Sequence, residues 1–372
     1  MKLQMHGKQS KGFPARSIAI GHAKRSGGKE LLFGIIVVAL VLCLAALCLE
    51  VGLRFLGHRG APESIMTNIR IVDDPILDWR YIPHSRFEQG KIVNQYNSVG
   101  FRGEEHSIEK PAGITRVVVI GDSVTEGYGV DWSDAFASSV QADLGSGYEI
   151  ISLGMGGLNT PQEVHILEQI GLRYDPAYVV VNLVLNDCDF FSSAREGAKH
   201  AEENQSRIAL LGIRIPPSIK RALKSSALVY LVNERVVDLW GRMKEEERHD
   251  YYEELWRNEQ NRAKVTTAFE KLRMLSRDHR FKVLVMVWPL VIEYTDYKFR
   301  SVHAWIMEQA AANDFAAIDL LPLYARQPFR TLQVTSEDYV HPNAIGHKIA
   351  AAEFVNWMGR AHASPSPIST GQ

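Results

Sequence analysis

The chain has 372 residues, of which 46% are hydrophobic, enough for one large domain with attached segments and too few for three domains. A formal net charge of −1 excludes the global positive field that is typical of nucleic-acid-binding proteins. The cysteines are Cys43, Cys48 and Cys188, and the first two lie in an apolar run. The sequence therefore predicts neither a disulfide scaffold nor a structural zinc site.

The N-terminal part of the chain has the pattern of a membrane anchor. Residues 1–30 are basic and rich in Gly and Ser, and we expect them to form a disordered cytoplasmic tail. The run LLFGIIVVALVLCLAALCL at residues 31–49 carries no charge, and as a helix it rises about 28 Å, enough to cross a bilayer core. A cleaved signal peptide is the alternative, but its apolar region is normally shorter and no A-x-A site follows. We expect an uncleaved transmembrane anchor at residues 31–54.

The basic flank predicts which side of the membrane the rest of the chain occupies. Positive residues favour the cytoplasmic side, so the chain after the anchor is expected to be extracytoplasmic, on the periplasmic side in a bacterium. Residues 55–110 contain several Pro and Gly turns and are expected to form a stalk or an N-terminal wrap. A folded domain is expected at residues 111–361, followed by a disordered tail at residues 362–372.

Within this domain, apolar β-branched runs alternate with segments of helical pattern. Strands are expected at residues 116–120, 148–153, 177–185, 281–287 and 316–320. Helices are expected at residues 132–144, 161–173, 296–312 and 343–359. Such near-continuous apolar strands indicate a parallel sheet that is covered on both faces. Residues from about 190 to 280, mostly helical in pattern, are interpreted as an insertion between the third and fourth strands.

Polar residues follow the predicted strands. Ser123 lies in a Gly-Asp-Ser turn after the first strand, Gly157 follows the second, and Asn186 follows the third. Asp338 and His341 lie in the loop after the fifth strand, spaced so that the carboxylate can reach the imidazole. Since the carboxyl ends of parallel strands meet at one edge of a sheet, these residues are expected to form one site.

The residue types in this set match nucleophilic catalysis. A serine hydroxyl needs a base within hydrogen-bond reach, and the base needs a third group to orient it. We therefore expect Ser123 to be the nucleophile, His341 its base, and Asp338 the partner that holds the imidazole tautomer.

Acyl chemistry also develops negative charge on the substrate carbonyl oxygen, which preorganised donors stabilise. The candidates are the backbone N–H of Ser123, the backbone N–H of Gly157 and the side-chain amide of Asn186. Whether Gly156 or Gly157 supplies the backbone donor stays open. Asp122 is interpreted as a cap of the turn, because no second carboxylate cluster at the strand ends could share a metal ion with it.

These blocks resemble those of the SGNH (GDSL-type) hydrolases over about residues 115–359. The resemblance implies a flavodoxin-like three-layer α/β/α sandwich with a five-stranded parallel sheet, and serine esterase or acyl-transfer chemistry without a metal or other cofactor. It also implies Ser123 as nucleophile, His341 as base and Asp338 as its partner, with Gly157 and Asn186 as oxyanion donors.

Two departures from the family pattern stand out, and neither removes a reacting group. The third block, LVLND at residues 183–187, lacks the glycine of the usual Gly-x-Asn-Asp, and Val124 stands where the first block often has Leu.

The functional hypothesis is a membrane-anchored, extracytoplasmic serine esterase that forms an acyl-enzyme on Ser123. O-acylated carbohydrate is the expected substrate class, because an anchored domain would meet acylated envelope glycans. An O-acetyltransferase and a lysophospholipase-like lipid esterase are the alternatives within this chemistry. An alternative of another class is a non-catalytic envelope binding or assembly protein that uses residues 190–280 as its surface.

Overall fold

A computed structural model describes residues 27–58, residues 68–188 apart from Pro75, Asp78 and Gly90, short stretches between 209 and 235, and residues 245–363 apart from Glu337. The chain divides into two units, Met1–Gly57 and His58–Gln372. Nearly all of the expected tails at residues 1–30 and 362–372, and most of the first half of the expected insertion, lie outside the described residues.

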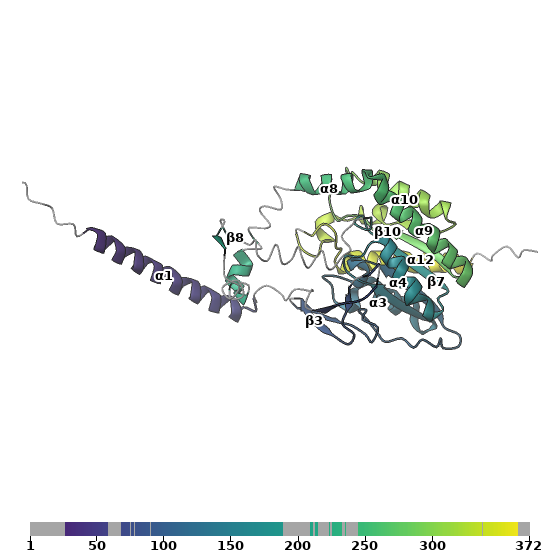
Figure 1. Ribbon diagram of the computed structural model, residues 1–372, viewed down its shortest axis with the longest axis horizontal. Coiled ribbons are helices and arrows are strands. Elements are labelled where there is room, and N and C mark those ends of the chain that lie inside the picture. Colours follow the sequence, from purple (N-terminus) through teal and green to yellow (C-terminus); the bar gives the residue numbers. More distant parts are fainter. Residues whose placement is uncertain are drawn as a thin grey trace, which may run out of the picture. The chain divides into compact units, whose positions relative to one another are not determined.

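The first unit contains one long apolar helix, α1 (Gly27–Phe55), drawn in purple in Figure 1. Its segment Lys29–Phe55 is long and apolar enough to cross a membrane. A helix with these properties near the N-terminus fits a membrane span or a signal sequence.

The second unit is built on a five-stranded parallel sheet with the strand order β11-β10-β7-β5-β6. Its strands are β5 (Thr115–Gly121), β6 (Tyr148–Gly154), β7 (Tyr178–Leu183), β10 (Lys282–Val287) and β11 (Ala316–Asp319). Every residue of the central β7 is buried, as expected for a strand covered on both faces. The predicted five-stranded parallel sheet is confirmed. Each strand begins and ends within two residues of its predicted bounds.

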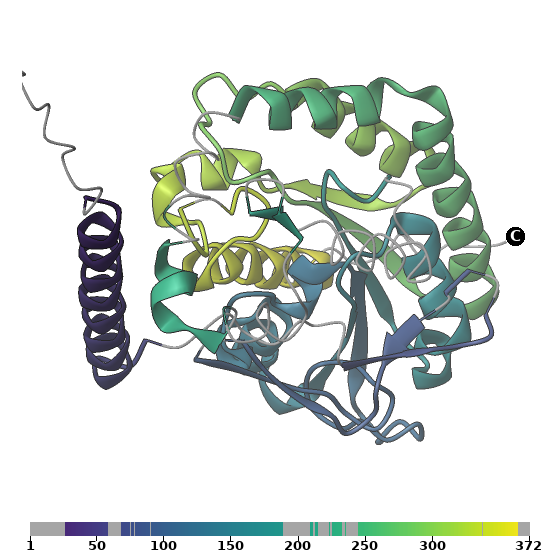
Figure 2. The same ribbon diagram turned by 60° about the vertical axis from the view of Figure 1, so that its left-hand side comes forward.

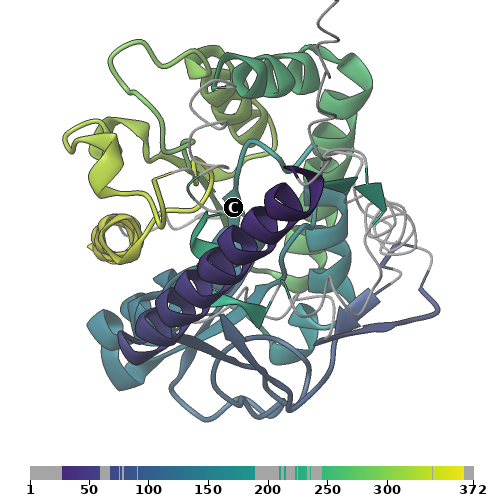
Figure 3. The same ribbon diagram turned by 90° about the vertical axis from the view of Figure 1, so that its left-hand side faces the viewer.

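Helices cover both faces of the sheet and complete the three-layer sandwich. On one face, α3 (Phe136–Leu144) packs against α12 (Ala344–Ala363), the yellow helix of Figures 2 and 3. On the other face, α9 (Glu259–His279) packs between α4 (Thr160–Gln169) and α10 (Arg300–Ala312).

The helix α9 lies inside the range interpreted as an insertion. Its side chains Val265, Phe269 and Leu272 are buried, so it serves as the crossover helix that a parallel β7–β10 connection requires. The segment added to the sandwich therefore ends before α9. The described part of that segment includes β8 (Ala209–Leu210), β9 (Ile213–Arg214), short helical stretches between residues 223 and 235, and α8 (Glu245–Arg257).

Two antiparallel hairpins precede the sheet and form the N-terminal wrap, which we define as residues 68–103. The strands are β1 (Ile69–Ile71), β2 (Trp79–Tyr81), β3 (Arg86–Gln89) and β4 (Ile92–Gln95). Tyr81, Tyr96 and Phe101 of the wrap are almost completely buried and belong to the same hydrophobic core as the sheet. The wrap is therefore part of the folded domain.

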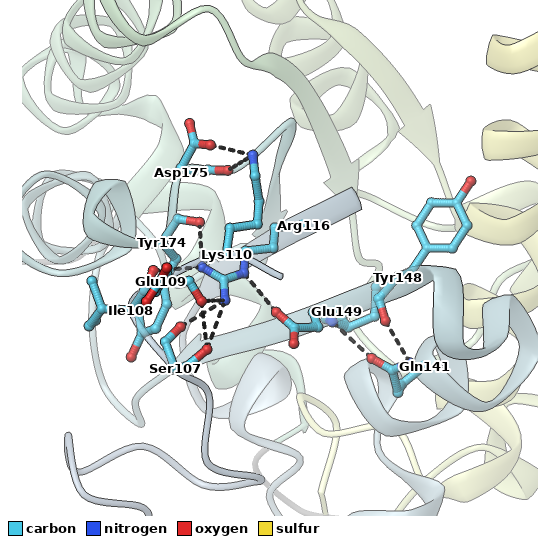
Figure 4. A network of polar contacts seen from close by, with 11 residues as sticks. Ser107, Ile108, Glu109, Lys110, Arg116, Gln141, Tyr148, Glu149, Tyr174 and Asp175 are labelled. Atoms are coloured by element: carbon cyan, nitrogen blue, oxygen red, sulfur yellow. Dashed lines mark hydrogen bonds and ion pairs between the residues drawn. The ribbon is translucent and has the colours of Figure 1, made fainter. Parts of the chain in front are cut away.

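A buried cation fastens the segment between the wrap and the first sheet strand. The Arg116 guanidinium on β5 is fully buried and forms an ion pair with Glu149 on β6 at 2.7 Å. It also donates to the carbonyl oxygens of Ser107, Ile108 and Glu109, as Figure 4 shows. These bonds offset the cost of burying the charge and tie the incoming chain to the sheet.

Short helices complete the fold. They are α2 (Ser123–Glu126), η2 (Trp132–Asp134), η3 (Gly145–Gly147), η4 (Gly171–Tyr174), α11 (Leu321–Tyr324) and η5 (Phe329–Thr331).

Candidate active site

The turn after β5 presents Ser123 at the carboxyl edge of the sheet. Asp122 caps α2, as the sequence indicated, because its Oδ1 accepts the Val124 N–H at 2.9 Å. Gly121 leaves no room for a side chain, since a Cβ there would lie 2.0 Å from the Thr125 Oγ1. Ser123 therefore occupies the first position of a helix whose start is fixed by the Asp122 cap and by the close packing at Gly121. Ser123 remains partly exposed.

Ser123, His341 and Asp338 form one continuous chain of hydrogen bonds. The Ser123 Oγ lies 2.8 Å from the His341 Nε2. The His341 Nδ1 lies 2.8 Å from the Asp338 Oδ2 and 3.0 Å from the Asp338 Oδ1. With the Nδ1–H donated to the carboxylate, the Nε2 lone pair faces the serine hydroxyl. This arrangement can take the proton of Ser123 when the oxygen attacks a carbonyl.

The Asp338 carboxylate is held in its ionised form. Burial disfavours the charge, but the hydrogen bonds and charge of His341 and the backbone N–H groups of Val340 and His341 outweigh it. Together they keep the pKa of Asp338 below its usual value. The same carboxylate therefore fixes both the backbone and the ring of His341.

Neighbouring groups limit the movement of the histidine loop. The Tyr128 ring packs against the His341 ring with 4.4 Å between the centroids. The Val291 N–H, in the loop after β10, donates to the Tyr339 carbonyl at 2.7 Å. Beyond the histidine, the Asn343 side-chain amide donates to the carbonyls of Thr331 and Gln333. The loop is thus held by two segments distant in sequence and by the stretch that directly precedes it.

The Asn186 side chain reaches the nucleophile turn. Its Nδ2 donates to the Asp122 Oδ2 at 2.9 Å, and that carboxylate oxygen lies 3.4 Å from the Ser123 Oγ. The turn that carries Asn186 is fixed by the Trp256 Nε1 of α8, which donates to the Leu185 carbonyl at 2.6 Å. An amide nitrogen carries two hydrogens, so the bond to Asp122 leaves one available for a substrate.

The two candidate glycines differ in what their N–H groups contact. The Gly156 N–H donates to the Glu126 Oε2 at 2.9 Å, so it is already used inside the protein. Among the described residues, the Gly157 N–H forms no hydrogen bond. Gly157 has φ +75° and a Cβ there would meet no atom within 4 Å, so this residue borders open space.

Other ionisable groups near the strand ends are buried behind this edge. Asp187 accepts the Val184 N–H at 2.7 Å, and burial raises its pKa. Burial likewise raises the pKa of Glu163, and it lowers the pKa of His347 to about 3. His347 packs against Trp288 in the core, so it does not serve as a second base. Within the described ranges, no group of three or more His, Cys, Asp or Glu side chains is arranged to hold a metal ion.

Sequence reasoning missed the groups that surround the nucleophile helix. Tyr81, Tyr96 and Arg102 lie in the stretch that is expected to form a stalk or wrap, and Glu126 and Tyr128 belong to no predicted site. The available signal is Glu126, a carboxylate three residues after Ser123 and six residues after the apolar run that ends at Ile120, because an ionised group near a buried segment needs partners.

A serine, a histidine and an aspartate joined at the carboxyl edge of a parallel sheet define this protein as a serine hydrolase. Residues 119–349 match the model of the GDSL-like lipase/acylhydrolase family, and the chain belongs to that family. The resemblance to SGNH hydrolases is thereby confirmed, and the protein is an enzyme that acts on ester bonds.

Solved structures with a similar course of the chain include several esterases. An acetyl xylan esterase, AlAXEase, is 17% identical, with 65% of this chain and 98% of that chain covered and a TM-score of 0.40. A two-domain esterase active on acetylated mannans is 12% identical, with coverages of 70% and 52% and a TM-score of 0.40. A carbohydrate acetylesterase family member from Sinorhizobium meliloti is 15% identical, with coverages of 68% and 100% and a TM-score of 0.36. No curated protein matches the chain.

Proposed function

We propose that the protein hydrolyses esters through an acyl-enzyme on Ser123. The Ser123 oxygen attacks the carbonyl carbon of the ester while its proton passes to the His341 Nε2. The tetrahedral intermediate then expels the alcohol, which takes that proton from His341. Water then attacks the acyl carbon while its proton passes to the His341 Nε2. The Ser123 oxygen leaves, takes that proton back, and the carboxylic acid is released. The observation that carries this proposal is the hydrogen-bonded chain from Ser123 through His341 to Asp338.

The donors for the developing oxyanion are the N–H groups of Ser123 and Gly157 and the second hydrogen of the Asn186 amide. The use of the Gly156 N–H by Glu126 favours Gly157 as the donor. Ser123 is the first residue of α2, and the first N–H groups of a helix have no partner within it, which supports the Ser123 N–H as a donor.

The substrate class that we propose is O-acylated carbohydrate on the outer side of a membrane. The apolar helix α1 and the basic residues that precede it support an anchor with a cytoplasmic N-terminus and an extracytoplasmic hydrolase. A domain tethered there meets acylated glycans of the envelope. Release of acetate from acetylated glycans, compared with fatty acid release from a lysophospholipid, distinguishes this substrate from a lipid ester.

The test of the chemistry uses the full chain in detergent and a short-chain aryl acetate. Ser123→Ala and His341→Ala should each lower kcat by about 10⁴ or more, because the nucleophile and its base act as a unit. Ser146→Ala and His279→Ala are matched controls at exposed positions and should keep the wild-type rate. Equal rates for all folded variants would contradict the proposed function and favour a non-catalytic role.

A further inference from the structure

A buried carboxylate lies one helical turn beyond the nucleophile. Glu126 is the last residue of α2, and its side chain is only 3% exposed. Its Oε2 accepts the Tyr81 hydroxyl at 2.8 Å and the Gly156 N–H at 2.9 Å. Its Oε1 accepts the Tyr96 hydroxyl at 2.6 Å. The mechanism above does not use this group, although it touches two of the segments that build the site.

The bond to Gly156 connects Glu126 with the oxyanion loop. Gly157 follows directly, so once the Gly156 amide is fixed, only the φ and ψ of Gly156 set the direction of the Gly157 N–H. The loop also lies against the nucleophile, because a Cβ added at Gly156 would lie 3.7 Å from the Ser123 Cβ and 3.2 Å from the Glu126 Oε2. Glu126 therefore joins the helix of Ser123 to the loop of Gly157.

The partners of Glu126 come from the N-terminal wrap. Tyr81 is the last residue of β2 and Tyr96 directly follows β4. The centroids of their rings lie 4.4 Å apart. Arg102, also in the wrap and 2% exposed, donates to the Gly127 carbonyl at 2.5 Å and to the Val130 carbonyl at 2.8 Å. The wrap thus holds both the side chain at the end of α2 and the backbone that follows it.

A buried carboxylate destabilises the folded state unless its oxygens accept hydrogen bonds. A buried carboxylate loses its hydration, and the loss is offset only by donors of good geometry or a nearby cation. Three donors converge on the Glu126 carboxylate. The Arg102 guanidinium donates to the Glu126 backbone carbonyl at 3.3 Å, and its charge favours the ionised carboxylate. An apolar side chain would fill the space at lower cost, but it could not hold the Gly156 N–H.

We propose that Glu126 is a positioning residue that holds the Gly156–Gly157 loop in place for oxyanion binding. The hydroxyl groups of Tyr81 and Tyr96 in the wrap orient the Glu126 carboxylate. The wrap then contributes to the geometry of the active site in addition to packing against the core. This inference rests on the proposed function, since it requires that Ser123 is the nucleophile and that the Gly157 N–H stabilises the oxyanion.

The test measures kcat and KM for the full chain in detergent with an aryl acetate. Glu126→Gln replaces a charged acceptor by a weaker neutral one and should lower kcat about 10-fold with KM within about twofold, because the loss falls on the transition state. Tyr96→Phe should lower kcat about threefold while the Gly156 bond remains. The double variant should equal Glu126→Gln alone, since both changes act through one carboxylate.

Tyr324→Phe is the matched control. It removes a buried tyrosine hydroxyl that donates to the Gly346 carbonyl at 2.9 Å and has no bond to Glu126. This variant should keep the wild-type kcat. Thermal unfolding of each variant checks that the comparison is made between folded proteins.

The outcomes separate the two proposals. If Ser123→Ala is inactive while Glu126→Gln and Tyr96→Phe keep the wild-type kcat, the positioning role is wrong and the proposed function stands. If Ser123→Ala keeps its rate, the proposed function fails and this inference with it. If Glu126→Gln does not fold, Tyr96→Phe decides, because an unchanged kcat or a change in KM alone would overturn the role.

Discussion

Asn186, the proposed oxyanion donor, is bonded to a buried carboxylate. Its Nδ2 donates to the Asp122 Oδ2, while the other Asp122 oxygen caps α2 through the Val124 N–H. Burial raises the pKa of Asp122, although the bonds from Asn186 and Val124 act in the opposite direction. The carboxylate therefore fixes both the start of the nucleophile helix and the plane of the Asn186 amide.

Replacing Asn186 by alanine should lower kcat by about 10²–10³, the usual cost of removing one oxyanion donor. KM should change little, because the donor acts mainly on the charge of the transition state. Steady-state hydrolysis of an aryl acetate by the full chain measures both quantities.

Asn313→Ala is the matched control for this change. It removes a buried amide that donates to the Gln309 carbonyl at the end of α10. Its kcat should equal that of the wild type. A wild-type kcat for Asn186→Ala would remove Asn186 from the oxyanion site.

At this scale the sequence singled out Ser123, Asp338 and His341, which the structure brings together, but not the residues that surround them. Ser123, Asp338 and His341 stand in patterns that a few residue types define locally. The role proposed for Glu126 depends on Tyr81 and Tyr96, which lie 45 and 30 residues away in the chain and come close only after folding. No local periodicity contains that information.

At the scale of elements, the strands of the sheet were predictable because burial on both faces leaves an apolar run that polar turns interrupt. The helix α9 shows where this reasoning stops. Its amphipathic pattern predicts a helix, but the pattern alone does not say whether its apolar face covers the sheet or belongs to an added segment. The burial of Phe269 decides between these two alternatives, and it is visible only in the folded structure.

The wrap is also held by a hydrogen bond between Asp74 and His165 of α4. The Asp74 Oδ2 lies 2.9 Å from the His165 Nε2, and Asp74 also accepts the N–H groups of Ile76 and Leu77. Burial opposes the charge of Asp74, but the bond from His165 and the two backbone N–H groups outweigh it and lower the pKa of Asp74 to about 2. Stability from this carboxylate is present above about pH 4 and is lost as the pH falls toward 2.

We therefore expect Asp74→Asn to lower the unfolding temperature at pH 5 to 7, with a difference that shrinks below about pH 4. The pair is partly exposed to solvent, so the effect should stay below about 1 kcal/mol, or about 2 °C. Thermal unfolding of the full chain across this pH range measures it.

Asp314→Asn is the control, since Asp314 forms an exposed pair with Arg277. Its unfolding temperature should follow that of the wild type at every pH. A constant deficit for Asp74→Asn from pH 3 to pH 7 would contradict the assignment.

At the scale of the whole molecule, the unit that contains the apolar helix α1 and the hydrolase unit are separate units of one chain. The sequence predicts a membrane span because a long uncharged run has few other uses, and the helix α1 agrees with that composition. The same helix does not distinguish a permanent anchor from a signal sequence, because cleavage depends on recognition of the flanking residues by a peptidase.

A C-terminal reporter that is active only outside the cytoplasm should be active when fused to the full chain in a bacterial host. The physical reason is the basic segment before α1, which retains the N-terminus in the cytoplasm. Intact mass of the membrane fraction should show the uncleaved N-terminus. Activity only of a cytoplasm-specific reporter would contradict the proposed topology.

The most direct test of the central claim is the site of covalent modification by an activated alkyl phosphonate. The reagent phosphonylates a serine that is deprotonated by an adjacent base, and the product resembles the tetrahedral intermediate. Peptide mass analysis of the full chain should place one adduct on Ser123, with no adduct in Ser123→Ala and strongly slowed labelling in His341→Ala. An adduct on another residue, or ester hydrolysis that continues in a protein fully modified at Ser123, would contradict this account.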